Sequence, residues 1–152
     1  MSGRNAQYQI TVPADTSIVI LPPRNNQESN VDGIWVASTA VTNGQILRVS
    51  GTQRDYMVLV AGNTGTAAPT GVAGKPEANG TATLIHCLSK APRITGNITQ
   101  ETDAEIYYHT GPVAAAAGGE YTYAQGQQYR TCDQEAVSVW SKSEVVLNVK
   151  DS

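Results

Sequence analysis

Short runs in which apolar and polar residues alternate recur along this chain. Residues 8–12 alternate with a period of two, which is the pattern of a strand with one buried face. Residues 17–21 form a continuous apolar run that Pro22 ends, because proline cannot donate a hydrogen bond to a strand ladder. The N-terminal part of the chain therefore predicts two strands, which we expect to form a β-hairpin.

The middle of the chain holds three further apolar runs, Ile34–Val36, Ile46–Val49 and Tyr56–Val60. A segment rich in Gly, Thr, Ala and Pro follows, and Thr81–Leu88 then resumes as a strand. Strand-favouring residues interrupted by Gly, Asn and Pro predict a compact antiparallel unit. The Gly-rich segment, residues 62–79, has few apolar anchors, so we expect it to be a long surface loop.

The C-terminal third predicts strands over Arg93–Gln100, Ala104–Thr110 and the two halves of Tyr121–Tyr129. In the second of these, Ile106 and Tyr108 would share one face and Tyr107 and His109 the other. Residues 134–141 and 144–149 alternate on either side of a Ser-Lys-Ser turn, and this pattern predicts a β-hairpin.

These patterns predict an all-β fold, an antiparallel β-sandwich or jelly-roll-like body with a small inserted or tandem β module and long surface loops. Residues 1–31 would form an N-terminal arm and a β-hairpin, and residues 32–88 the small module. Residues 89–152 would form the C-terminal part of the sandwich, in one continuous domain with residues 1–31 or apart from it. A chain of 152 residues has room for one domain or two very small ones.

Composition narrows the classes of function. The formal net charge is -3 and the basic residues are scattered, which argues against a nucleic-acid partner. The start of the chain lacks the apolar core of a signal peptide and no run is long enough to span a membrane, so we expect a soluble product without a membrane partner. Cys87 and Cys132 could pair, but a reducing compartment favours free thiols.

Residues capable of catalysis are few. His86 and Cys87 are neighbours on an expected strand, so they would point to opposite faces and could not form a nucleophile–base pair. An acidic group near His109 could hold a cation, although a solvated turn is the expected interpretation; its members are Glu101, Asp103 and Glu105. Hydrolase, phosphate-loop and metalloprotease motifs are absent from the sequence. We expect no enzyme activity, no catalytic residues, no metal and no cofactor.

The middle of the chain resembles a small carbohydrate-binding-type β module common in virion proteins of tailed bacteriophages. The resemblance is carried by Trp35–Thr39, Asn43–Gln45, Tyr56–Thr70 and Asn79–Thr83, in that order. In that family a Trp opens the module, a Tyr strand leads into a Gly-rich loop, and a Gly-Thr-Ala-Thr segment closes it. Leu84 stands where the family usually has an aromatic residue. The segment from Ala104 to Val149 is also similar to the ends of small β-sandwich domains on phage heads and tails.

Aromatic residues are the remaining candidates for a binding surface, because a flat ring can stack on a sugar or bury itself against another protein. The module pattern assigns Trp35 and Tyr56 to a core. Four others stay as candidates for a sugar platform or a subunit interface: Tyr107, Tyr121, Tyr123 and Trp140.

The resemblance implies a structural virion protein, and we expect a capsid decoration or cement protein made in the host bacterial cytoplasm and placed on the capsid surface. Its partners would be the major capsid protein and itself, as a homotrimer. Polar arms at residues 1–7 and 24–30 would become ordered on binding. The alternative is a tail-fibre or tail-tip protein that recognises a host surface glycan.

Overall fold

The computed structural model describes residues 6–24, 31–87, 93–111, 114 and 119–152, which form fifteen β-strands and no helix. No helix long and apolar enough to cross a membrane occurs in this part of the chain. Most of the two polar arms expected at residues 1–7 and 24–30 lies outside the described residues. Where they are described, Ala6 and Gln7 begin strand β1 and Arg24 is buried, so these positions are part of the folded body and not of an arm.

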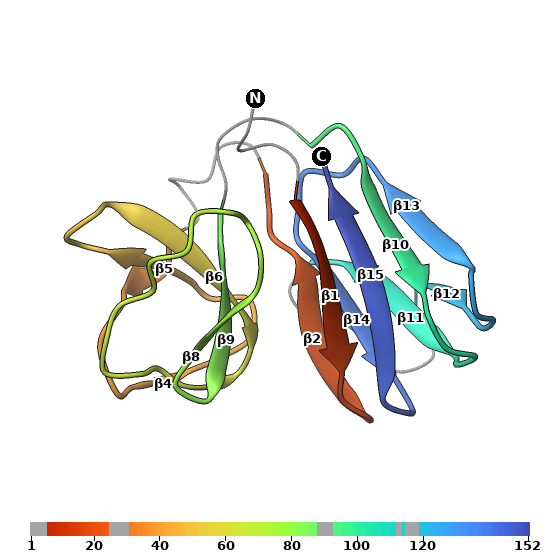
Figure 1. The fold of residues 1–152 in the computed structure, drawn as a ribbon, viewed down its shortest axis with the longest axis horizontal. Coiled ribbons are helices and arrows are strands. Elements are labelled where there is room, and N and C mark those ends of the chain that lie inside the picture. Colours follow the sequence, from red (N-terminus) through yellow and green to blue (C-terminus); the bar gives the residue numbers. More distant parts are fainter. Residues whose placement is uncertain (1–5, 25–30, 88–92, 112–113, 115–118) are drawn as a thin grey trace.

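Two four-stranded sheets form the right-hand body in Figure 1. Sheet A has the order β1 (Ala6–Val12), β15 (Val145–Asp151), β10 (Gly96–Gln100) and β13 (Gln128–Thr131). Sheet B has the order β12 (Glu120–Thr122), β11 (Ile106–Thr110), β14 (Val137–Ser141) and β2 (Thr16–Leu21). All neighbours within both sheets are antiparallel. The larger body is therefore an antiparallel β-sandwich, as the sequence predicted.

Apolar side chains from alternate positions of both sheets fill the space between them. The buried residues of this sandwich core include Ile10, Val12, Ile18, Ile98, Ile106, Val139, Leu147 and Val149. Tyr108 stacks on Tyr129 with the ring centroids 4.5 Å apart. The Tyr108 hydroxyl lies 3.0 Å from Thr122 Oγ1, which donates to Gln100 Oε1 over 2.6 Å, so the buried polar atoms beside the stacked rings are paired.

Residues 31–87 form the left-hand body in Figure 1, here called the module. Its five-stranded sheet C has the order β3 (Gly33–Ile34), β5 (Ile46–Val49), β6 (Arg54–Val60), β9 (Ala82–His86) and β8 (Glu77–Asn79). A two-stranded ladder joins β4 (Ala40–Val41) to β7 (Gly62–Asn63). All of these pairs are antiparallel except β3 with β5, which run parallel.

Sheet C is apolar on both faces. Tyr56, Val58 and Leu84 pack with the half-buried Trp35 in a small core of the module. Residues at the intervening positions of sheet C, including Met57, Leu59 and Ile85, belong to the same buried cluster as the sandwich core. Burial on both faces is the reason that residues 56–60 read as a continuous apolar run. The module and the sandwich therefore share one core.

Asn79, the last residue of the Gly-rich segment 62–79, joins that segment to Trp35 near the start of the module. Asn79 Oδ1 accepts hydrogen bonds from Trp35 Nε1 over 3.1 Å and from the Gly65 amide over 2.9 Å. Its Nδ2 donates to the Ala67 carbonyl over 2.9 Å. Gly80 follows with φ +67, and a Cβ there would lie 2.2 Å from a backbone oxygen, so the turn after Asn79 requires glycine.

Both hairpins expected from the sequence are wrong. Strands β14 and β15 are consecutive in the chain but lie in sheets B and A, and strands β1 and β2 are likewise divided between the two sheets. Strand β14 instead pairs with β11 and β2, and β15 with β1 and β10. The apolar faces of consecutive strands then face one another across the core, an arrangement that produces the same alternation of residues as a hairpin.

Candidate functional site

The four aromatic residues singled out from the sequence lie next to one another on the outer face of sheet B. Tyr107 of β11 is directly opposite Tyr121 of β12 on one side and Trp140 of β14 on the other. The ring centroids are 5.9 Å apart for Tyr107 and Tyr121, and 6.2 Å apart for Tyr107 and Trp140. Tyr123 extends the line, 5.9 Å from Tyr121. We call these four residues the aromatic row.

Strand alternation places the row on the outside. On β11, Ile106 and Tyr108 are buried in the sandwich core, so Tyr107 must point the other way. On β14 the buried Val139 likewise leaves Trp140 on the outer face, and Thr122 is the buried neighbour of Tyr121. Three strands thus contribute to one continuous aromatic surface.

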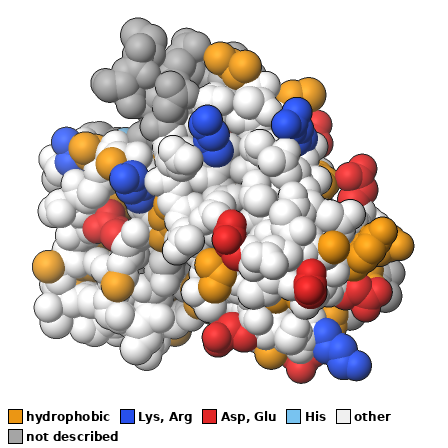
Figure 2. Space-filling model, turned by 45° about the vertical axis from the view of Figure 1, so that its right-hand side comes forward, with side chains coloured by type: hydrophobic (Ala, Val, Ile, Leu, Met, Phe, Trp, Pro, Cys, Tyr) orange, Lys and Arg blue, Asp and Glu red, His pale blue; other side chains and the backbone are white. Residues whose placement is uncertain are grey.

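The exposure of the row increases toward the edge of the sheet. Trp140 and Tyr107 are half-buried, whereas Tyr121 and Tyr123 are 55% and 60% exposed. The planes of neighbouring rings are tilted by 40° to 44°, between a stacked and an edge-to-face arrangement. Figure 2 shows hydrophobic side chains gathered at the right-hand edge of the molecule, on the side of β12 and β13, with acidic side chains nearby.

One acidic residue lies beside the row. The exposed Glu105 precedes β11 and is on the same face as Tyr107, whereas Glu120 of β12 is opposite Tyr108 and so points to the other face of the sheet. Desolvation, with a smaller contribution from the Glu105 carboxylate, raises the pKa of Tyr107 above its ordinary value. The phenol is therefore neutral at physiological pH and can donate a hydrogen bond. The row combines apolar ring surface and phenol donors with one neighbouring carboxylate, that of Glu105, which suits stacking and burial better than acid–base chemistry.

The potentially reactive side chains do not converge. Among the described residues, no group of three or more His, Cys, Asp or Glu side chains is close enough to hold a metal ion. His86 rests against Tyr56 with ring centroids 5.3 Å apart, while the adjacent Cys87 is buried in the shared core. Burial raises the pKa of Cys87 to about 12, so its thiol is protonated and unreactive. Cys132 is exposed, and the two thiols are not bonded to each other.

The described residues also line grooves that were not foreseen from the sequence, among them a larger and a smaller one. The larger, about 610 Å³, lies on the outer face of sheet A and is lined mainly by polar side chains of β1, β10 and β15. The smaller, about 180 Å³, lies beside the exposed Ile34 and Val36 of the module. The alternation of polar residues along β1 and β15 was visible in the sequence. Only the fold reveals that these two ends of the chain pair side by side.

No family model, no curated protein and no solved structure matches this chain. Its surfaces, together with the sequence pattern, are therefore the basis on which a function can be inferred.

Proposed function

We propose that this chain is a non-catalytic structural protein of a tailed-bacteriophage particle, a capsid decoration protein that binds neighbouring capsid subunits through the aromatic row. The proposed partners are the major capsid protein and further copies of this chain, in a homotrimer. The sequence resemblance supplies the class of particle, and the aromatic row supplies the surface that would dock.

The single observation that carries the proposal is the continuity of the row. Scattered exposed apolar residues are normal on a protein surface, but adjacent exposed rings are not. Tyr121 and Tyr123 are each more than half exposed and lie in line with Tyr107 and Trp140. Burying an exposed aromatic ring is worth roughly 1.5–3 kcal/mol, and Tyr and Trp are enriched at the centres of protein interfaces.

A decoration protein needs only a modest interface at each copy. Capsid symmetry repeats the same contact over the particle, and linkage within an oligomer raises the effective concentration of every further contact. A rigid sandwich suits this task, because little conformational entropy is lost when a preformed surface docks.

Electron microscopy of the particle tests the proposal directly. A tagged chain should appear on the head at symmetry-related positions, and purified heads should retain it after removal of the tails. Replacing Tyr121 and Tyr123 together by Ser should weaken head binding by about thirtyfold, the equivalent of roughly 2 kcal/mol at an interface hot spot. Ile94→Ser is the matched control, since Ile94 is 66% exposed but lies outside the row.

Two results would count against this proposal, the first against the decoration role and the second against the aromatic row as its docking surface. One is localisation to the tail alone. The other is unchanged head binding by the Tyr121→Ser/Tyr123→Ser variant while its circular dichroism and thermal unfolding remain those of the parent protein, which would exclude the row as the docking surface.

The second candidate function is a tail-fibre or tail-tip protein that recognises a host surface glycan. The exposed ring faces of Tyr121 and Tyr123 favour it, because the apolar face of a sugar ring stacks on an aromatic ring. Binding on a glycan array that is lost in Tyr107→Ala or Tyr121→Ala would support this function over decoration.

A further inference from the structure

The outer face of sheet A carries the larger groove, about 610 Å³, on the opposite side of the sandwich from the aromatic row. After the turn from Figure 1 to Figure 2 the sandwich comes forward, and the middle of the visible face is almost free of hydrophobic side chains. Such a surface is built for a polar ligand, because apolar ligands require apolar walls.

The strand register arranges the groove's polar side chains in two cross-strand rows. In the first, Lys150 of β15 lies opposite Gln7 of β1 and Asn97 of β10. In the second, Asn148 of β15 lies opposite Gln9 of β1 and Thr99 of β10. Neighbouring strands are roughly 4.8 Å apart, so the rows form a regular grid of hydrogen-bonding groups.

The grid is dominated by carboxamides. A carboxamide offers two N–H donors and a carbonyl acceptor, so it can bind a hydroxyl group in either role. Gln7, Gln9, Asn97 and Asn148 place four such groups in one groove, and Thr99 adds a hydroxyl. Adjacent donor–acceptor groups at fixed spacing match the successive hydroxyls of a sugar.

Two amides in the floor of the groove differ in how the protein holds them. The Asn148 Nδ2 donates to Glu101 Oε1, which orients that side chain. The Asn97 Oδ1 is shielded from solvent and accepts no hydrogen bond. A buried acceptor without a partner costs free energy, and the terminal torsion of Asn rotates easily, so the Asn97 amide can turn to meet a ligand.

Positive charge lies at the same groove. Lys150 belongs to its central strand, and Lys75 of the module contributes to its wall. Arg130 of β13 is opposite Asn97, one strand farther along the first row. The described residues that line the groove include two lysines and no acidic side chain, while the Glu101 carboxylate contacts the groove only through its hydrogen bond with Asn148. A local excess of cations on an acidic protein favours an anionic ligand.

We propose that this groove binds an acidic oligosaccharide, with the carboxamide grid holding the sugar hydroxyls and the lysines holding the carboxylate. The ligand would lie across β1, β15 and β10, with its negative group toward Lys150 and Lys75. The aromatic row is on the other outer face of the sandwich, so docking through the row leaves the groove open. A particle-bound copy would then present the groove to the surface of a cell.

The observations favour a saccharide over other anionic polymers. A protein that binds single-stranded nucleic acid stacks the bases on aromatic side chains and neutralises many phosphates. The one aromatic residue in the lining, Tyr8, has its hydroxyl tied to the Ile20 carbonyl and packs against the sandwich core. The groove therefore offers a grid for hydroxyl groups but no stacking platform.

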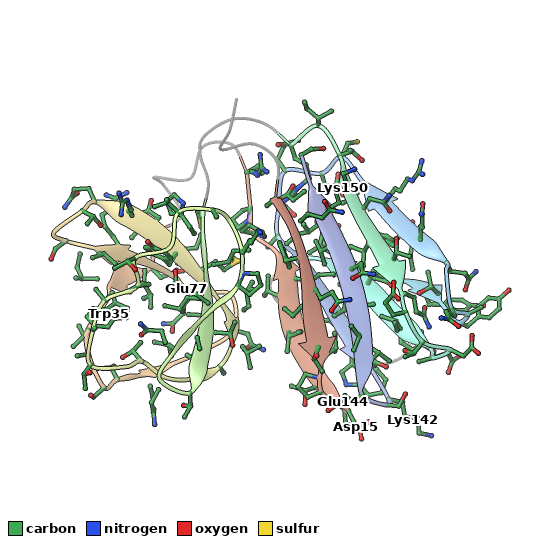
Figure 3. The ribbon with its side chains drawn as sticks, viewed as in Figure 1. Asp15, Trp35, Glu77, Lys142, Glu144 and Lys150 are labelled. Carbon is green, nitrogen blue, oxygen red and sulfur yellow. The ribbon has the colours of Figure 1, made fainter. Side chains whose placement is uncertain are left out.

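The test uses the full-length protein and NMR titration with oligogalacturonate, its neutral methyl ester, and a single-stranded oligonucleotide. Side-chain amide signals are direct reporters, and those of Gln7, Gln9, Asn97 and Asn148 should shift with oligogalacturonate. Lys150→Ala should weaken binding of the acid by about tenfold, the usual weight of one charge-assisted hydrogen bond. Lys142→Ala is the matched control, because Lys142 is exposed at the opposite end of β15 from Lys150 (Figure 3).

Further outcomes separate this site from the aromatic row. Binding through the groove should persist in the Tyr121→Ser/Tyr123→Ser variant, so failure of the docking proposal would leave it untouched. The groove proposal is overturned if oligogalacturonate shifts no groove amide at millimolar concentration. It is equally overturned if the shifts map to the aromatic row, if the methyl ester binds as tightly as the acid, or if the oligonucleotide binds more tightly than either sugar.

Discussion

Arg93 Nε donates a hydrogen bond to Asp151 Oδ1 over 2.8 Å, and both side chains are almost completely shielded from solvent. Arg24 Nη2 approaches the other carboxylate oxygen at 3.3 Å. Arg24 and Arg93 flank the segment that contains the module, and Asp151 is on the last strand of the sandwich. The buried Asp151 carboxylate therefore binds Arg24, where the chain leaves the sandwich, and Arg93, where it returns.

Replacing Asp151 by Asn should strongly destabilise the fold. The substitution removes the negative charge and leaves two buried guanidinium groups without their carboxylate, a change that typically costs about 3–5 kcal/mol. Urea unfolding at neutral pH should show a correspondingly lower midpoint. Glu144→Gln, on the exposed turn before β15, should change the free energy of unfolding by about 0.5 kcal/mol or less. Equal effects of the two substitutions would contradict a structural role for the buried charges.

The module and the sandwich should unfold in one transition, because Met57, Leu59 and Ile85 of sheet C belong to the sandwich core. The two tryptophans report on the two bodies separately: Trp35 packs in the module and Trp140 lies on sheet B. Fluorescence of Trp140→Phe and Trp35→Phe variants should therefore give coincident urea transitions. Leu59→Ala should lower both midpoints together, at a cost of about 2–5 kcal/mol. Two separate transitions would show that the cores are independent.

The two cysteines should differ sharply in reactivity. Cys132 is exposed, whereas Cys87 is buried and its pKa is raised to about 12 by desolvation, with a smaller contribution from Asp55. At mildly alkaline pH a thiol reagent should label only Cys132 in the native protein and both cysteines in denaturant. Cys132→Ser should abolish labelling of the native protein. Rapid modification of Cys87 without denaturant would contradict its burial in the shared core.

Stability should fall on mild acidification because of His86. Burial, the largest cause, lowers the pKa of His86 below its ordinary 6.5, and a hydrogen bond with the Val72 backbone opposes the shift. The unfolded chain then binds a proton more readily than the folded one. The contribution of the neutral imidazole to stability is complete above pH 6.5 and is lost as the pH falls toward the folded pKa.

Urea midpoints measured between about pH 7.5 and about pH 5 test this dependence. The midpoint should decrease over that interval in the parent protein, and His86→Gln should reduce the decrease. His109→Gln, which removes the second histidine of the chain, is the control and should retain it. If the urea midpoint of His86→Gln decreased with pH as much as that of the parent protein, His86 would not be the cause of the decrease.

The sequence by itself determined most of the longer strands and the alternation of their side chains, but not the short strands β4, β7 and β8, the last two of which lie in the segment expected to be a loop. Period-two alternation is a local property, so Ile106 and Tyr108 could be assigned to one face and Tyr107 to the other without knowledge of the neighbours, and the structure places the first pair in the core. The exposed positions of Tyr121 and Tyr123 follow from the same rule once Thr122 is placed inside.

Only the tertiary structure decided which strands pair. Alternation is the same for a hairpin and for two strands that face each other across a core, so the separation of β14 and β15 into different sheets left no trace in the sequence. Pairing of β1 with β15 brings Gln7 next to Lys150, at opposite ends of the chain. The groove exists because of that long-range register, whose free energy comes from burying the opposite faces of the same strands.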